Sequence, residues 1–179
     1  MEALQKIVII GPESTGKSTL SSQLANHYGT KWVPEYAREY LLKYGTDYTF
    51  EDLYHIGKNQ LRIEDEYAEK LKSGLLFIDT DMYVMKVWCE VVFGKVHQFI
   101  EEAISTRKYD LYLLCDTDLP WVKDELREYP NLETRRKLFL IYKDLMENQP
   151  VPWVLITGNQ QERLKTAIDA VEKFKAGKL

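Results

Sequence analysis

The sequence has no excess of positive charge and no long hydrophobic run, and each shortage excludes a class of protein. Its 179 residues include 24 lysines and arginines against 28 acidic residues, for a formal net charge of −4. A protein that works on nucleic acid needs basic residues to neutralise phosphates, so we expect no nucleic-acid partner. No apolar run approaches the roughly 20 residues of a transmembrane helix, so we expect no membrane partner either.

Cysteine is also scarce, and the cysteines that occur lack the spacing of a metal or disulfide site. Cys89 and Cys115 both lie in apolar stretches and form no CxxC pattern. We interpret them as small core residues in a reducing compartment. Residues 1–6 lack the basic start and the apolar core of a signal peptide, so the expected location is cytoplasmic.

What the sequence does contain is a glycine-rich loop, Gly-Pro-Glu-Ser-Thr-Gly-Lys-Ser, at residues 11–18. It lies between the β-branched run 7–10, which is typical of a strand, and residues 19–25, which have a helical pattern. Backbone N–H groups of such a loop can surround an anion, and the helix N-terminus adds the positive end of its dipole. This context predicts that the chain binds a nucleoside triphosphate; a chance match in a surface loop is the alternative.

The polar residues of this phosphate loop (residues 11–18) have expected roles. Lys17 is expected to reach the β- and γ-phosphates, and the Ser18 hydroxyl to bind Mg²⁺. The other residues expected to contact the nucleotide are Gly11, Glu13, Ser14, Thr15, Gly16 and Thr19.

The rest of the chain alternates short apolar runs with helical patterns. Strands are expected near residues 5–10, 31–33, 75–78, 109–115 and 153–156, and helices over 17–28, 35–42, 50–72, 82–93, 97–107, 133–147 and 160–175. This alternation predicts an α/β fold, a five-stranded parallel sheet with helices on both faces, in a single domain over residues 1–179. Ligands of such sheets bind at the carboxyl ends of the strands.

Carboxylates follow the second, third and fourth expected strands, the last of them Asp116 and Asp118, and those after the second and third are the candidates for chemistry. Asp79 directly follows the third strand, where phosphate-loop proteins hold Mg²⁺, although Asp79 and Asp81 could each cap the next helix instead. Asp81 is expected to be that cap or a substrate ligand. Glu35 ends the second strand and could accept a proton from a hydroxyl acceptor or bind that acceptor. Arg38, three residues on, could contact an acceptor phosphate, or form a solvated ion pair with Glu35 of little energetic weight.

Residues 117–132 are charged and contain two prolines, which predicts a loop-rich lid segment. Phosphoryl transfer needs cations around the transferred group, and a mobile loop can deliver them after substrate binds. Lys123 and Arg127 lie in this lid segment, and Arg135 and Arg136 in the helix that follows. We favour Arg127 because it lies inside the segment, beside acidic residues that could hold it when the lid is open. Arginines also occur on surface helices for solubility alone.

Two aromatic residues have a placement that suggests more than packing. Tyr36 is next to Glu35, and Trp88 lies about two turns into the helix that follows Asp79. Both could face an acceptor pocket and stack on a flat ring, although core packing is the stronger interpretation for Trp88.

Five stretches together resemble the nicotinamide riboside kinase domain of NadR-type NAD regulators and related stand-alone P-loop ATPases and kinases. They are residues 11–18, 34–39, 77–81, 118–127 and 157–163. The similarity spans nearly the whole chain, and the ordered set is much more specific than the phosphate loop alone. Larger members carry an adenylyltransferase domain before the kinase; this chain begins almost at its first expected strand, so we expect neither NAD synthesis nor gene repression from it.

The resemblance implies a P-loop kinase of the nucleoside-monophosphate-kinase type, with ATP and Mg²⁺ as cofactors. Its expected reaction makes nicotinamide mononucleotide from nicotinamide riboside. By the same resemblance Glu35 and Asp79 fall on the acceptor and magnesium positions, Arg127 on the lid, and Asn159 beside the adenine.

Two alternatives stay open from the sequence. One is a regulatory ATPase or nucleotide switch that signals through a partner; the chain lacks the Asn-Lys-x-Asp guanine motif of GTPase switches and a separate helical lid domain. The other is a different nucleoside or nucleotide kinase, which would share the fold and differ in the acceptor pocket. The sequence does not distinguish ATP from GTP, does not assign the catalytic base among Glu35, Asp79 and Asp81, and does not give the oligomeric state.

Overall fold

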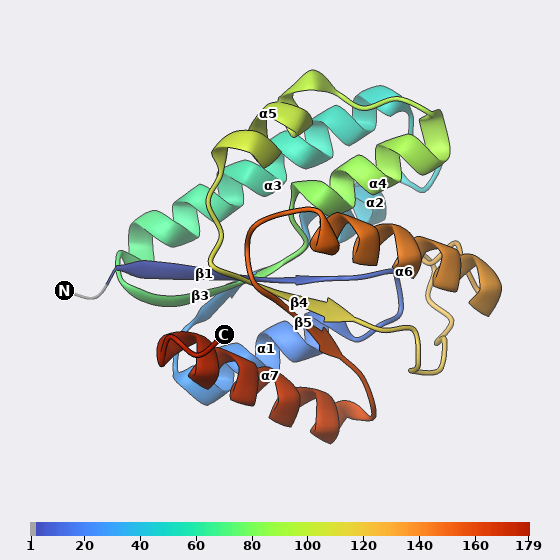
Figure 1. The fold of residues 1–179 in the computed structure, drawn as a ribbon. Coiled ribbons are helices and arrows are strands. Elements are labelled where there is room, and N and C mark those ends of the chain that lie inside the picture. The colour runs from blue at the N-terminus through green and yellow to red at the C-terminus, as the bar shows by residue number, and fades with distance from the viewer. Residues whose placement is uncertain (1–2) are drawn as a thin grey trace.

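A computed structural model describes residues 3–179 and contains a five-stranded parallel sheet (Figure 1). The strands are β1 (Leu4–Ile10), β2 (Lys31–Val33), β3 (Gly74–Asp79), β4 (Leu111–Cys115) and β5 (Trp153–Ile156). Their order is β2-β3-β1-β4-β5, and each neighbouring pair is parallel. The predicted fold class is therefore confirmed. Because the phosphate loop leaves the central strand β1, it lies in the middle of the carboxyl edge.

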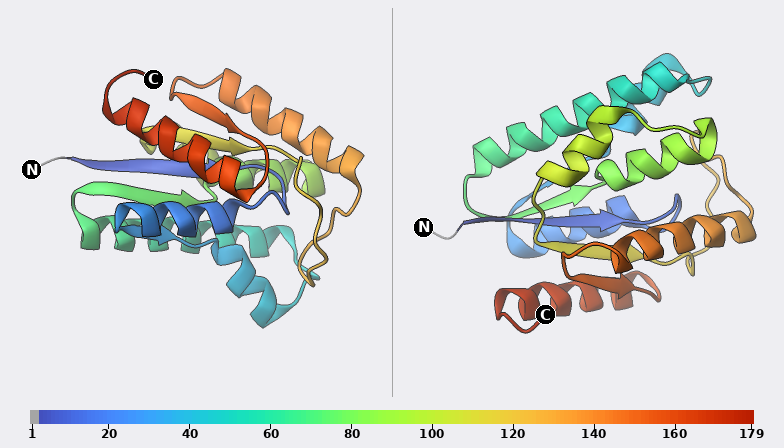
Figure 2. Two further views of the ribbon diagram at one scale, coloured as in Figure 1. Left: turned by 90° about the horizontal axis from the view of Figure 1, so that it is seen from below. Right: turned by 45° about the horizontal axis from the view of Figure 1, so that its top comes forward.

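Helices cover both faces of the sheet. They are α1 (Lys17–Tyr28), α2 (Tyr36–Tyr44), α3 (Phe50–Leu71), α4 (Met82–Phe93), α5 (Gln98–Thr106), α6 (Leu132–Glu147) and α7 (Gln160–Lys175). Helices α1 and α7 lie on one side, and α3, α4 and α6 on the other (Figures 1 and 2). Within residues 3–179, no helix combines the length and apolar character needed to cross a bilayer.

The expected bounds agree with the observed ones within about two residues. Differences of two residues occur at the end of α2, expected at residue 42 and found at Tyr44, and at the start of β4, expected at residue 109 and found at Leu111. The carboxylate of Asp110 accepts a hydrogen bond from the backbone N–H of Lys6 at 2.7 Å, and this side-chain contact precedes the backbone ladder between β1 and β4.

The alternating side chains of β1 join two apolar layers. Ile7 and Ile9 pack on the side of α1 and α7, while Val8 and Ile10 pack on the side of α4 and α6, and all are fully buried. A strand buried on both faces needs apolar residues at every position, which explains the continuous run seen in the sequence. The carboxyl end of β1 is thereby fixed in position, and the loop that follows it has a rigid base.

A third apolar cluster joins α2, α3, α4 and α5 away from the sheet. Its centre includes Ile56, Met85 and Ile100, all of which are buried. Gly57 of α3 allows close packing here, because a Cβ at this position would lie 2.8 Å from Cζ of Phe99. This cluster supports α4, whose other face borders the candidate site.

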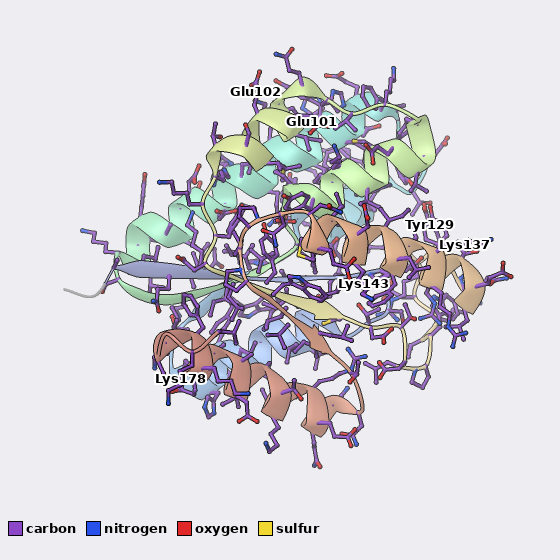
Figure 3. All side chains as sticks on the ribbon, viewed as in Figure 1. Glu101, Glu102, Tyr129, Lys137, Lys143 and Lys178 are labelled. Carbon is purple, nitrogen blue, oxygen red and sulfur yellow. The ribbon has the colours of Figure 1, made fainter. Side chains whose placement is uncertain are left out.

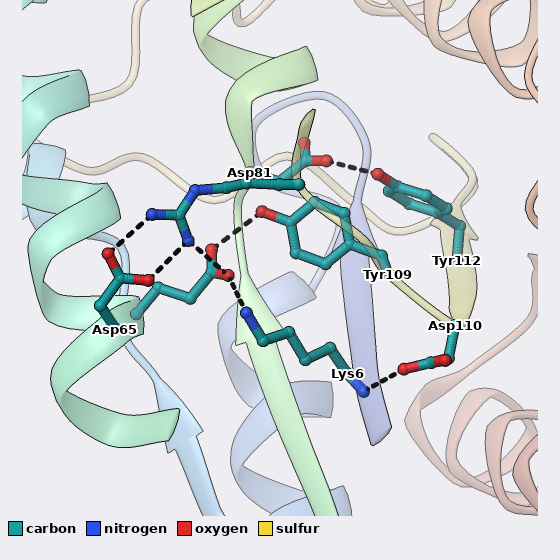
Figure 4. Close-up of polar contacts among 8 residues, drawn as sticks. Lys6, Asp65, Asp81, Tyr109, Asp110 and Tyr112 are labelled. Carbon is teal, nitrogen blue, oxygen red and sulfur yellow. Dashed lines mark hydrogen bonds and ion pairs between the residues drawn. The ribbon is translucent and has the colours of Figure 1, made fainter. Parts of the chain in front are cut away.

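Helix α3 contains one buried charged residue, Glu64, to which sequence analysis assigned no role. Glu64 is 1% exposed and forms ion pairs with Lys6 and Arg107, while Tyr109 donates a hydrogen bond to it at 2.9 Å. Figure 4 shows this polar cluster between α3 and the first strand. A glutamate at a helix position with apolar neighbours cannot be recognised as buried from periodicity, because its partners come from distant segments.

Candidate active site

The phosphate loop has the backbone conformation of an anion-binding site. Gly11 has φ +144°, and a Cβ there would lie 2.6 Å from the carbonyl oxygen of Cys115. Gly16 has φ +77° and caps the N-terminus of α1. The turn at Gly16 directs the first N–H groups of α1 toward the loop, where they and the helix dipole favour a phosphate. The loop geometry therefore fits the phosphates of a nucleotide.

Ser18 and Asp79 bring two oxygen ligands together beside this loop. The hydroxyl of Ser18 donates a hydrogen bond of 2.5 Å to Oδ2 of Asp79, which is fully buried. Burial raises the pKa of Asp79, while the charge of Lys17 and the Ser18 hydrogen bond oppose that shift. Residues 3–179 contain no group of three or more histidine, cysteine, aspartate or glutamate side chains placed to hold a metal. A small oxygen set fits Mg²⁺, which keeps waters and phosphate ligands.

A cavity of about 260 Å³ adjoins the phosphate loop and extends toward α2 and α4. It is lined by most of the predicted residues: Gly11, Glu13, Ser14, Thr15, Gly16, Lys17, Ser18, Thr19, Glu35, Arg38, Trp88 and Arg127. Asp79 does not line it and contacts the lining through Ser18. The phosphate loop and Glu35, which follow β1 and β2, thus border one space.

Glu35 is half-buried at the N-terminus of α2. Burial and, to a smaller extent, the nearby charge of Asp79 raise the pKa of Glu35 to about 7, while Lys17 and Arg38 act in the opposite direction. A carboxyl group with a pKa near neutrality can take up or release a proton at physiological pH. The position and the pKa are both compatible with a role toward an acceptor hydroxyl.

The far wall of the cavity is apolar. It is formed by Val84, Val87 and Trp88 of α4 and by Leu138 and Tyr142 of α6. The indole N–H of Trp88 donates a hydrogen bond of 2.9 Å to the hydroxyl of Tyr48, which holds the ring at the cavity. Trp88 therefore borders the candidate site, and core packing alone does not describe its position.

The lid segment lies over this cavity. Residues 116–131 contain no helix or strand, and residues 126–129 line the cavity. Figure 3 shows Tyr129 on the same side of the molecule as Lys137 of α6. The carboxylate of Glu13 accepts hydrogen bonds from the backbone N–H groups of Glu128 and Tyr129. The side chain of Glu13 therefore binds the lid segment, so only its backbone remains available to a nucleotide.

The arginines around the lid are not paired as expected. Arg127 lines the cavity, but its Nη1 donates a 2.5 Å hydrogen bond to the carbonyl of Val122, within the lid segment itself. Asp124, which could have held Arg127, accepts two hydrogen bonds from Arg38. Arg38 consequently links α2 to the lid segment and forms no ion pair with Glu35.

Besides Asp79, three predicted site residues do not line the cavity. Tyr36 packs in the cluster of α2–α5. Asp81 is 2% exposed; it caps α4 by accepting from the N–H of Tyr83, and it accepts from the hydroxyl of Tyr112 at 2.8 Å. Burial raises the pKa of Asp81 to about 7. Asn159 caps α7 with its side-chain oxygen. The geometry gives Asp81 and Asn159 local capping roles.

Sequence analysis assigned no role to Arg163, which lies beneath the phosphate loop. It is 3% exposed and donates hydrogen bonds to the carbonyls of Gly158 (2.7 Å), Thr15 (2.8 Å) and Asp116 (3.0 Å), and to the carboxylate of Asp118. It thereby connects the phosphate loop to the ends of β4 and β5. Arg163 belongs to the stretch 157–163 that sequence analysis singled out, but the sequence alone did not indicate that its side chain is buried.

The parallel sheet, the phosphate loop on its central strand and the lid segment together define a P-loop protein with the fold of nucleoside and nucleotide kinases. The family described as AAA domain matches residues 6–163, and the chain belongs to this family.

Among curated proteins, the chain is similar to the trifunctional NAD biosynthesis/regulator protein NadR. It is 30% identical to the protein of Escherichia coli (strain K12) over 157 residues, covering 86% of this chain and 38% of the relative. It is 29% identical to the protein of Salmonella typhimurium, again covering 38% of the relative. The chain therefore spans less than half the length of these relatives.

Solved structures show the same fold. A NadR protein in complex with NR matches with a TM-score of 0.74 and 20% identity, over 96% of this chain and 52% of that one. A deoxyadenosine kinase from M. mycoides, with the products dCMP and dCDP bound, matches with a TM-score of 0.64 and 13% identity, over 94% and 100%. A thymidylate kinase from Ehrlichia chaffeensis matches with a TM-score of 0.65 and 13% identity, over 97% and 98%.

Proposed function

We propose that this protein is an ATP-dependent kinase that transfers the γ-phosphate to the 5′-hydroxyl of a riboside, with nicotinamide riboside as acceptor and nicotinamide mononucleotide as product. The observation that carries the proposal is that one cavity is bordered by the phosphate loop and by Glu35. A kinase needs this arrangement, because the acceptor hydroxyl must meet the γ-phosphate in line.

Each role follows from a position described above. The loop N–H groups and Lys17 bind the phosphates, and Ser18 and Asp79 hold Mg²⁺, which supplies positive charge to the phosphate oxygens. Glu35 accepts a hydrogen bond from the acceptor hydroxyl and orients its oxygen toward the phosphate. The lid segment excludes water, which would otherwise compete with the acceptor.

The charge of the cavity supports the choice of acceptor. Glu13 and Glu35 line it, and Asp79 lies directly behind the lining. Carboxylates favour a cationic pyridinium nucleoside over an anionic monophosphate, and the aromatic face of Trp88 suits a flat ring. The relatives point in the same direction, because a NadR protein with the same fold binds NR.

The fold of deoxyadenosine and thymidylate kinases supports a second candidate, a kinase with another nucleoside or nucleotide as acceptor. ADP release should therefore be followed with ATP and Mg²⁺ in the presence of nicotinamide riboside, thymidine, cytidine, nucleoside monophosphates or no acceptor. Lys17→Ala is the blank.

We expect turnover to be stimulated by nicotinamide riboside, with a product heavier by one phosphate. A higher kcat/KM with thymidine or a monophosphate would reject nicotinamide riboside as the acceptor. Slow release that no acceptor changes would instead favour a regulatory ATPase.

A further inference from the structure

Three cationic side chains of the described chain line the cavity, those of Lys17, Arg38 and Arg127. Lys17 and Arg127 each donate a hydrogen bond to a backbone carbonyl, at 2.8 and 2.5 Å, and a neutral carbonyl leaves their positive charge in place. Arg38 differs, because its partner is the carboxylate of Asp124. One of the cations at the cavity is therefore neutralised by the protein itself.

The guanidinium of Arg38 presents its two-pronged end to Asp124. Nη1 donates to Oδ1 at 3.2 Å, and Nη2 donates to Oδ2 at 2.9 Å. This is the edge with which an arginine binds two oxygens of a phosphate group. Asp124 therefore occupies the position that a phosphate would need in order to bind Arg38 in this way.

Asp124 is oriented by its own segment of the chain. Its Oδ1 accepts a hydrogen bond of 3.0 Å from the backbone N–H of Leu126, two residues further along the lid segment. The hydrogen bonds from Arg38 and then from Leu126 lower the pKa of Asp124, so its carboxylate is charged at neutral pH. The lid segment thus presents a fixed negative charge to Arg38.

The surroundings of Arg38 are acidic. Arg38 lies three residues after Glu35, the N-cap of α2, and both line the cavity. The hydrogen bond to Asp124 raises the pKa of Arg38, and three nearby carboxylates raise it further through their charge, those of Asp124, Glu125 and Glu35. A phosphate at this end of the cavity would meet these carboxylates, and like charges repel one another.

The fold itself does not decide whether an acceptor carries a phosphate, because a deoxyadenosine kinase and a thymidylate kinase share it. Side chains at the acceptor end have to make this distinction. We propose that Asp124 is a specificity-determining residue, which excludes phosphorylated acceptors by occupying Arg38. The proposal rests on the acceptor site of the proposed function. A riboside offers a hydroxyl and needs no cation here, whereas a monophosphate finds the guanidinium already bound to a carboxylate.

The test measures acceptor binding while the nucleotide site is filled. The full chain is saturated with Mg²⁺ and AMP-PNP, so that a monophosphate can bind only at the acceptor end. Titration calorimetry then gives Kd for nicotinamide mononucleotide and cytidine monophosphate, with nicotinamide riboside as the ligand without phosphate. Two monophosphates with different bases are used because the proposal concerns the phosphate group.

The variants separate the charge of Asp124 from its other contacts. Asp124→Asn removes the charge and keeps an oxygen for the N–H of Leu126, and Asp124→Ala removes the whole group. Glu125→Gln is the matched control, because it removes a negative charge from the exposed neighbouring residue. The double variant Arg38→Ala/Asp124→Asn removes the guanidinium that the first substitution releases.

We expect Asp124→Asn and Asp124→Ala to bind both monophosphates at least about tenfold more tightly than wild type, because Arg38 then offers charge-assisted hydrogen bonds to the phosphate. Glu125→Gln should stay within about threefold of wild type, and the double variant should lose the gain. Neither single variant should bind the riboside more tightly. Monophosphate affinities of both Asp124 variants that match Glu125→Gln would overturn the proposal. So would a gain that persists in the double variant, because Arg38 would then not be the group released.

Failure of the kinase proposal is distinguishable from failure of this one. If nicotinamide riboside neither binds nor stimulates turnover while the Asp124 variants gain affinity for monophosphates, the riboside assignment falls and the role of Asp124 stands. If wild type phosphorylates the riboside and the Asp124 variants gain no affinity for monophosphates, the proposed function stands and the role of Asp124 falls.

Discussion

Arg38 and Asp124 form a bidentate pair, with hydrogen bonds of 3.2 and 2.9 Å, that joins helix α2 to the lid segment. Their side chains are 51% and 21% exposed. An exposed pair contributes roughly 0–1 kcal/mol to stability, so its main effect is on the position of the lid segment. Glu35 is the N-cap of the same helix, which places this contact beside the acceptor end of the cavity.

Breaking this pair should affect the acceptor more than stability. We expect Arg38→Ala and Asp124→Ala each to raise the acceptor KM several-fold and to change the free energy of unfolding by less than about 1 kcal/mol. The double variant should be no worse than either single one. Steady-state kinetics and urea unfolding measure both effects. Arg62→Ala, which breaks the exposed Arg62–Glu66 pair of α3, is the control. Additive losses in the double variant would show that the two residues act separately.

The pKa of Glu35 predicts how stability depends on pH. This pKa is raised from 4.5 to about 7 in the folded protein, so the folded state holds the proton more tightly than the unfolded state. The stability from this group is present below about pH 4.5 and is lost as pH rises to about 7. The Tm of wild type should therefore fall relative to that of Glu35→Gln between about pH 4.5 and about pH 7. Above this window the difference between the two Tm values should stay constant.

The measurement is thermal unfolding from pH 4 to 8 without nucleotide or Mg²⁺, because both would change the charge near Glu35. Glu39→Gln on the exposed side of α2 shows the general effect of removing one negative charge from this helix. A Tm difference between wild type and Glu35→Gln that stays flat over the whole range would mean that Glu35 titrates alike in both states.

The sheet and the phosphate loop could be predicted because their determinants are local. The runs around Ile9 and Phe77 had no polar interruption, and the spacing of Gly11, Gly16 and Lys17 specifies a loop conformation. Strand ends then placed Glu35 and Asp79 near one another, since parallel strands share a carboxyl edge.

The contacts of the other site residues could not be predicted, because they depend on pairings between segments that are distant in the sequence. Glu13 has the spacing of a nucleotide contact, yet its carboxylate binds backbone N–H groups 115 and 116 residues away. Arg135 and Arg127 look alike in the sequence, and only burial separates them. Asp81 could be a cap or a substrate ligand, and the hydroxyl of Tyr112, 31 residues away, supplies the contact that occupies its second oxygen.

Arg163 should be needed for the shape of the phosphate loop. Its planar group serves four acceptors at once, and a lysine has no such fork. We expect Arg163→Lys to destabilise the fold by about 2–4 kcal/mol in urea unfolding and to weaken AMP-PNP binding, with faster hydrogen exchange at residues 13–18. Arg136→Lys, on an exposed site, should do neither. A loss of stability with unchanged exchange in the loop would limit Arg163 to a general packing role.

Glu64 tests whether the buried polar cluster stabilises the fold. Its carboxylate is the shared partner of Lys6 and Arg107, whose side chains are 20% and 19% exposed. Glu64→Gln keeps an acceptor for Tyr109 but leaves the two cations without their common counter-charge. Partial exposure of both cations reduces the cost below that of a fully buried pair, to about 2–3 kcal/mol.

Glu66→Gln on the same helix is the matched variant, because its pair with Arg62 is exposed and should contribute less than about 0.5 kcal/mol. Urea unfolding of both variants separates the two environments. Equal losses would mean that solvent reaches Lys6 and Arg107 well enough to replace the carboxylate. A large loss at Glu64 alone would show that this cluster, which joins α3 to β1, stabilises the strand from which the phosphate loop extends.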